Sequence, residues 1–135
     1  KLAAEMEADE LLDLINAIYT SIDHCAECIG HVWKVEIIGD CYLALVGGPT
    51  PCDNHAYRAT CLALAIVETV ERIGTRVQVP IQVRIGVHTG SVVAGVVGSA
   101  MPRYLITGVD CLITSALEKD AEPNTVLISE ATERE

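Results

Sequence analysis

Apolar residues recur along this chain with two different periods, and the order of these periods constrains the fold more than any other feature. A spacing of three and four residues predicts helices over about 7–29, 53–72 and 109–119. Alternation of apolar and other residues predicts strands over about 33–37, 41–46, 81–87, 91–97, 103–106 and 126–128. This order predicts an α+β domain, in which helices cover one face of a largely antiparallel sheet.

Turn-forming residues stand between the predicted elements. Gly30 follows the first helix, where glycine often ends a helix. Gly39 and Asp40 separate two apolar runs and predict the tight turn of a β-hairpin. Asp53 or Asn54 precedes the second helix, and either side chain can cap a helix N-terminus.

Polar side chains alternate with the apolar residues of the predicted strands, and we expect them to share the face that the helices leave open. They are Lys34, Glu36, Gln82, Arg84 and His88. Two interpretations fit this pattern: a face in contact with solvent, or the wall of a cleft formed when two such sheets face each other.

Composition narrows the classes of partner. The chain of 135 residues is half apolar, which suits one domain, and its formal net charge is −10. Nucleic-acid-binding domains present basic surfaces, so we expect no nucleic acid partner. No apolar run approaches the ~20 residues of a membrane span, so we expect no membrane contact by this domain.

The six cysteines fall mostly in apolar or helical stretches, which favours reduced, buried thiols and a cytoplasmic location. His24, Cys25, Cys28 and His31 form one cluster with a possible zinc-ligand spacing. No second cysteine pair follows at the distance of a zinc finger. The same spacing arises on one face of a helix, and we favour that interpretation.

Three motifs connect the chain to a known family. They are Lys34–Tyr42 (KVEIIGDCY), Arg84–Gly90 (RIGVHTG), and Ala94–Gly98 with Met101–Tyr104 (AGVVG and MPRY). Together they resemble the catalytic domain of the class III nucleotide cyclases, the adenylyl and guanylyl cyclases. The resemblance extends from about Glu7 to Thr132 and is of the guanylyl type.

The resemblance implies a fold and an activity. It implies that residues 1–135 form a ferredoxin-like cyclase domain that begins after the first strand of the family, so that we expect a fragment of a longer protein. Family members pair head to tail with a second cyclase-type domain, as homodimers or heterodimers. They bind a nucleoside triphosphate with Mg²⁺ or Mn²⁺ and form a 3′,5′-cyclic nucleotide with release of pyrophosphate.

Some positions of the family site are retained here. Asp40 matches one of the two metal-binding aspartates. The other lies, in the family, on a strand before the first helix, which either this fragment omits or the parent protein lacks. Glu36 matches the residue that reads the base, where a carboxylate accepts hydrogen bonds from guanine. Leu105 stands at the second base-reading position and offers no hydrogen bond.

Other positions depart from the family. Leu112 occupies the place of the asparagine that orients the ribose, and Ala116 that of the arginine that meets transition-state charge. Thr125 stands where many active members have a phosphate-binding lysine. The aspartate of the family's helix start falls at Val109 here, and Asp110 follows it, displaced by one residue.

Two functions remain open on these grounds. In the first, the chain is the metal-binding half of a dimeric cyclase that forms cGMP from GTP together with a complementary domain. In the alternative, it is a catalytically inactive cyclase-homology module for dimerisation, assembly or regulation. Without the asparagine and the arginine, the isolated chain is expected to be inactive.

Overall fold

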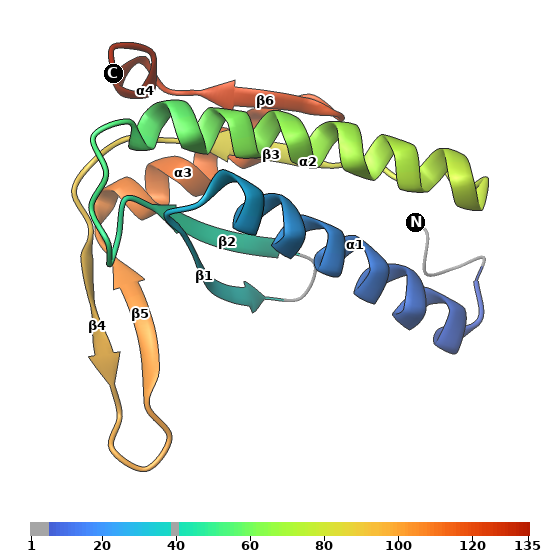
Figure 1. Cartoon of the computed structure of the whole chain (residues 1–135), viewed down its shortest axis with the longest axis horizontal. Coiled ribbons are helices and arrows are strands. Elements are labelled where there is room, and N and C mark those ends of the chain that lie inside the picture. The colour runs from blue at the N-terminus through green and yellow to red at the C-terminus, as the bar shows by residue number, and fades with distance from the viewer. Residues whose placement is uncertain (1–5, 39–40) are drawn as a thin grey trace.

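The computed structural model describes residues 6–38 and 41–135 (Figure 1). Its helices are α1 (Ala8–Ile29), α2 (His55–Val77), α3 (Val109–Asp120) and α4 (Glu130–Glu133). Its strands are β1 (Val32–Ile38), β2 (Cys41–Val46), β3 (Arg84–Val87), β4 (Val93–Val97), β5 (Arg103–Thr107) and β6 (Thr125–Ile128). The order of predicted elements is therefore confirmed, and α4 is added at the end. In the described part of the chain, no helix is both long and apolar enough to span a membrane.

The strands form three pairs in the part of the chain that the structure describes. β1 pairs with β2 and β4 with β5, both antiparallel, whereas β3 pairs with β6 in parallel. The α+β class is thus confirmed, with two of the three pairs antiparallel. The β4–β5 hairpin projects away from the rest of the domain (Figure 1).

The core lies where α1 and α2 run side by side over the strands (Figure 1). Ile22 of α1 and Leu62, Ile66 and Val70 of α2 are buried together. Burial of one such side chain stabilises a fold by roughly 1.5–3 kcal/mol relative to leaving it exposed. The helical spacing of these residues explains why both helices were evident in the sequence.

Helix α3 packs on the face of β3 opposite to the face that α1 and α2 cover. This differs from the expectation that all helices cover one face. Ile85 packs toward α1 and α2, whereas a Cβ on its neighbour Gly86 would lie 2.6 Å from the carbonyl oxygen of Thr114 in α3. Because successive strand residues point to opposite faces, β3 lies between α2 and α3. Only glycine allows α3 to approach the strand this closely.

The helix boundaries also differ in detail from the sequence prediction. Gly30 ends α1 with a positive φ of 71°, as expected. Helix α2 continues to Val77, about a turn beyond the predicted end at Arg72. Asn54 precedes α2, but its side chain does not cap the helix and instead accepts a hydrogen bond from Arg58 Nε at 2.8 Å.

Candidate functional site

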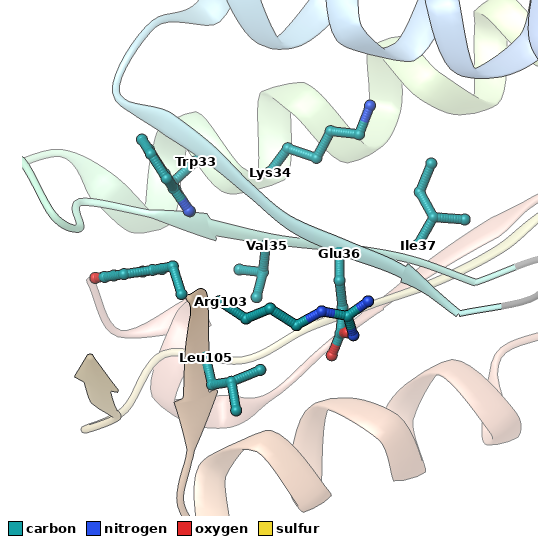
Figure 2. Close-up of a pocket in the computed structure, with 8 residues that line it drawn as sticks. Trp33, Lys34, Val35, Glu36, Ile37, Arg103 and Leu105 are labelled. Atoms are coloured by element: carbon teal, nitrogen blue, oxygen red, sulfur yellow. The ribbon is translucent and has the colours of Figure 1, made fainter. Parts of the chain in front are cut away.

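A pocket of about 340 Å³ lies between β1 and β5 (Figure 2). It brings together Glu36 and Leu105, the two positions that the sequence singled out for reading a base. The two residues belong to different hairpins, so their proximity depends on the contact between β1 and β5. Figure 2 shows the Glu36 carboxylate on the side of β1 that faces β5.

A bulge in β1 decides which side chains enter this pocket. Lys34 is paired with Ala44 of β2, but Glu36 is paired with the adjacent Leu43, so one residue is extra on β1. Lys34 therefore points toward α1, where its ammonium lies 2.6 Å from the carboxylate of Asp23, while Glu36 points toward β5 (Figure 2). The expectation that Lys34 and Glu36 share one polar face is wrong for this reason.

The carboxylate of Asp23 also accepts a hydrogen bond from the hydroxyl of Tyr42 at 3.0 Å. Burial, followed by this hydrogen bond, raises the pKa of Tyr42 well above its usual range. Asp23 thus joins α1 to both strands of the β1–β2 hairpin, and the polar end of Lys34 is held away from the pocket.

Arg103 also lines the pocket, and the sequence interpretation did not single it out. Its side chain extends along the wall toward Glu36 (Figure 2). The pocket therefore contains both a hydrogen-bond acceptor and a guanidinium donor. The signal in the sequence was the alternation of β5, which places Arg103 and Leu105 on the same face of that strand.

Asp40, the predicted metal ligand, lies outside the described residues, as does its neighbour Gly39 in the predicted turn. Within residues 6–38 and 41–135, no group of three or more histidine, cysteine, aspartate and glutamate residues could hold a metal ion. The cluster of His24, Cys25, Cys28 and His31 falls within this range. Among these four residues, Cys28 Sγ lies 3.8 Å from His24 Nε2. All six cysteines are outside disulfides, as expected for reduced thiols. The expectation that they are buried is wrong, because Cys28 and Cys41 are exposed and the other four are only partly buried.

Leu112 and Ala116 lie on the exposed surface of α3, and 70% of Leu112 is accessible to solvent. With Val109 they follow the helical spacing of three and four residues and form an apolar stripe. Thr125, at the start of β6, donates a hydrogen bond from its hydroxyl to the carbonyl of Glu122. These three predicted positions do not line the pocket of Glu36 and Leu105.

A second cavity, of about 510 Å³, lies between β2 and β3. Residues 42–46 of β2 line it, together with residues 85–90 of β3 and the segment that follows. Small apolar residues of α2 contribute another wall. Neither facing strand edge has a strand partner in the described residues.

Of the other predicted polar residues, Arg84 and His88 contact α3, whereas Gln82 precedes β3 and is exposed. Arg84 forms an ion pair with Glu118 at 2.8 Å. His88 lies 3.1 Å from the carboxylate of Asp110, in the first turn of α3. The hydrogen bond from His88, and next that from the backbone of Ser91, lower the pKa of Asp110 below its usual value.

The fold and these sites can now be compared with known proteins. The family model described as adenylate and guanylate cyclase catalytic domain matches residues 1–135. The chain is 36% identical over 133 residues to a membrane guanylyl cyclase of Dictyostelium discoideum, covering 98% of this chain and 9% of that protein. It is 35% identical over 134 residues to the soluble guanylate cyclase gcy-31 of Caenorhabditis elegans, covering 98% of this chain and 19% of that protein. It thus spans less than a fifth of either relative.

Solved structures share the fold. The guanylate cyclase domain of RhGC from Catenaria anguillulae, solved in complex with GTP, superposes with a TM-score of 0.91 at 31% identity, over 98% of this chain and 72% of that one. The adenylyl cyclase CyaB of P. aeruginosa superposes with a TM-score of 0.93 at 26% identity, over 98% of this chain and 71% of that one. The chain belongs to the adenylate and guanylate cyclase catalytic-domain family.

Proposed function

We propose that this domain is one half of a dimeric cyclase that forms cGMP from GTP and releases pyrophosphate. The observation that supports this proposal most directly is the pocket shared by Glu36, Arg103 and Leu105. Its volume of about 340 Å³ is in the range of small-molecule sites. A purine base fits such a pocket with its polar edge toward the two charged side chains.

The chemistry of the pocket favours guanine. The carboxylate of Glu36 accepts hydrogen bonds from the ring N–H and the amino group of guanine. The guanidinium of Arg103 can donate to the O6 and N7 acceptors of the same base, the pairing that arginine prefers with guanine. Adenine presents an amino group in place of O6, so it would face Arg103 with a donor. Leu105 adds apolar contact without selecting either base.

A second cyclase-type domain would complete the site. Leu112 and Ala116 offer neither a hydrogen bond for the ribose nor a charge for the triphosphate, so a partner would have to supply both groups. The β4–β5 hairpin supports the pairing, because Val93, Val96 and Val97 are exposed on a projecting strand. Exposed apolar surfaces of this kind commonly mark interfaces.

In this proposal Asp40 would hold Mg²⁺ or Mn²⁺ from this side of the dimer. Mg²⁺ is commonly bound through one or two carboxylates together with substrate phosphates. Bound metal would neutralise charge on the triphosphate. The described residues do not form a metal site by themselves, so the contribution of this chain's described part is to bind and orient the base.

A second candidate function is that of an inactive module that retains only the pairing surface. The exposed apolar stripe of Val109, Leu112 and Ala116 favours this candidate, because an apolar surface serves an interface better than a phosphate-binding groove.

One experiment separates the two functions. The purified chain, extended at its N-terminus with the first strand of the family and its metal aspartate, is assayed with GTP or ATP and Mn²⁺. It is assayed alone and mixed with a cyclase domain that carries the family asparagine and arginine but has its own metal aspartates replaced. We expect no appreciable turnover alone and GTP-dependent cGMP formation in the mixture. Stable pairing without turnover would support the inactive module, and robust turnover by the chain alone would contradict both.

A further inference from the structure

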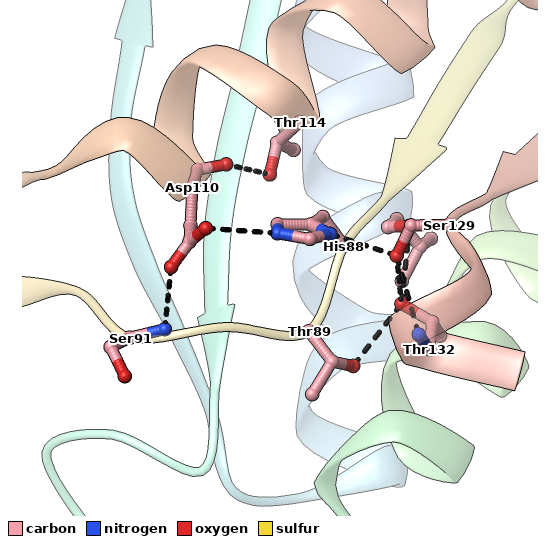
Figure 3. Close-up of polar contacts among 8 residues, drawn as sticks. His88, Thr89, Ser91, Asp110, Thr114, Ser129 and Thr132 are labelled. Carbon is pink, nitrogen blue, oxygen red and sulfur yellow. Dashed lines mark hydrogen bonds and ion pairs between the residues drawn. The ribbon is translucent and has the colours of Figure 1, made fainter. Parts of the chain in front are cut away.

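A hydrogen-bonded cluster of side chains lies where β3, α3 and α4 meet (Figure 3). His88, at the centre, directly follows β3, and 9% of its side chain is exposed. Its Nε2 lies 3.1 Å from Asp110 Oδ1, and its Nδ1 lies 2.8 Å from Ser129 Oγ. The imidazole therefore joins the second residue of α3 to the residue that precedes α4.

The carboxylate of Asp110 is held on both oxygens. Oδ1 faces His88, and Oδ2 accepts a hydrogen bond from the backbone N–H of Ser91 at 2.7 Å. A Cβ on Gly90 would lie 2.4 Å from this carboxylate. Asp110 can therefore approach the backbone after β3 this closely only because residue 90 is glycine. The backbone carbonyl of Asp110 also accepts a hydrogen bond from the hydroxyl of Thr114.

On the other side of His88, Ser129 accepts a hydrogen bond from the backbone N–H of Thr132 and so caps α4. The hydroxyl of Thr132, which is buried, donates to the carbonyl of Val87 at the end of β3. Ser129 is therefore tied both to His88 and to the short helix that follows it.

We infer that Asp110 is a positioning residue, which fixes the start of α3 on the end of β3 through His88 and the Ser91 backbone. The adjacent Val109, which matches the aspartate of the family motif, is 71% exposed and makes no such contact. The position of Leu112 and Ala116, on the outer face of α3, therefore depends on Asp110.

This role also determines which ring nitrogen of His88 carries a proton. An ionised carboxylate can only accept hydrogen bonds, so Nε2 of His88 carries the proton that faces Asp110. In the neutral imidazole, Nδ1 must then accept a hydrogen bond from the hydroxyl of Ser129. A purely space-filling role for Asp110 would not select one tautomer.

The test is to measure the imidazole ¹⁵N shifts of His88 by NMR in the full chain, near neutral pH. In the natural chain we expect the Nε2–H tautomer. In Asp110→Asn, the amide oxygen can accept from Ser91 while its NH₂ faces His88, so we expect the Nδ1–H tautomer. An unchanged tautomer in Asp110→Asn would overturn the inference.

Hydrogen exchange gives a second readout that does not need the tautomer. In Asp110→Ala, we expect the amides of residues 111–114 to exchange roughly tenfold faster, with the amides of the α1–α2 core unchanged. The matched control is Asp120→Asn at the other end of α3, which should leave these amides as they are. Equal acceleration throughout the domain, or none in 111–114, would contradict the positioning role. Neither measurement uses nucleotide, so a failure here is distinguishable from a failure of the proposed function.

Discussion

The rings of Trp33 and Tyr104 meet edge to face, with their centroids 5.4 Å apart and their planes at 65°. This contact joins the β1–β2 hairpin to the β4–β5 hairpin beside the pocket of Glu36 and Leu105. The residues that are proposed to contact the base, Glu36 on one hairpin and Arg103 and Leu105 on the other, therefore lie beside an aromatic pair that joins the two hairpins.

The first prediction concerns this aromatic pair. Trp33→Ala should lower the free energy of unfolding by about 1 kcal/mol from the lost ring contact, with a further loss from packing. Urea unfolding of the two single variants and of Trp33→Ala/Tyr104→Ala forms a double-mutant cycle. Additive effects would show that the rings do not stabilise each other. Leu64→Ala, on the exposed surface of α2, serves as a control.

The second prediction concerns base selection in the mixed dimer. Glu36→Lys replaces an acceptor with a donor, so kcat/KM for GTP should fall roughly ten- to hundredfold, the range expected for one bidentate contact to a base. The ratio of ATP to GTP turnover should rise. Lys34→Met is the matched control, since the ammonium of Lys34 is held by Asp23 and points away from β5. An equal change in kcat/KM in both variants would show that Glu36 does not contact the base.

The third prediction concerns Asp40, whose position lies outside the described residues. Asp40→Ala should abolish turnover of the mixed dimer and leave assembly intact, because the metal ligand is lost while the pairing surface is retained. Size-exclusion chromatography measures assembly, and cGMP formation measures turnover. Full activity in Asp40→Ala would show that Asp40 has no role in metal binding. Its replacement would then change the free energy of unfolding by no more than ~1 kcal/mol.

The fourth prediction concerns pH. The pKa of Asp110 is lowered in the folded domain, chiefly by the hydrogen bond from His88. Its contribution to stability is therefore fully present above the ordinary aspartate pKa of about 3.9 and is lost as pH falls through the lowered folded value. The difference in unfolding free energy between the natural chain and Asp110→Asn should be steady above about pH 5 and shrink below it. A difference that stays constant to pH 3 would contradict this prediction.

The sequence by itself determined the order of the elements and the family. Helices α1 and α2 were predictable because their buried residues, such as Ile22, Ile66 and Val70, repeat at the helical period. The β1–β2 hairpin was predictable because two apolar runs flank Gly39 and Asp40, residue types that favour turns. These are local patterns, and burial of one face is sufficient to produce them.

Only the tertiary structure decided which residues meet. The bulge after Lys34 turns Glu36 toward β5, and the absence of a side chain at Gly86 lets α3 pack on the second face of β3. Neither appears as a change in hydrophobic period. The pocket with Arg103 and the contacts of His88 with Asp110 and Ser129 join segments distant in the sequence. Such contacts depend on how packed elements are oriented, which side-chain alternation within one strand does not specify.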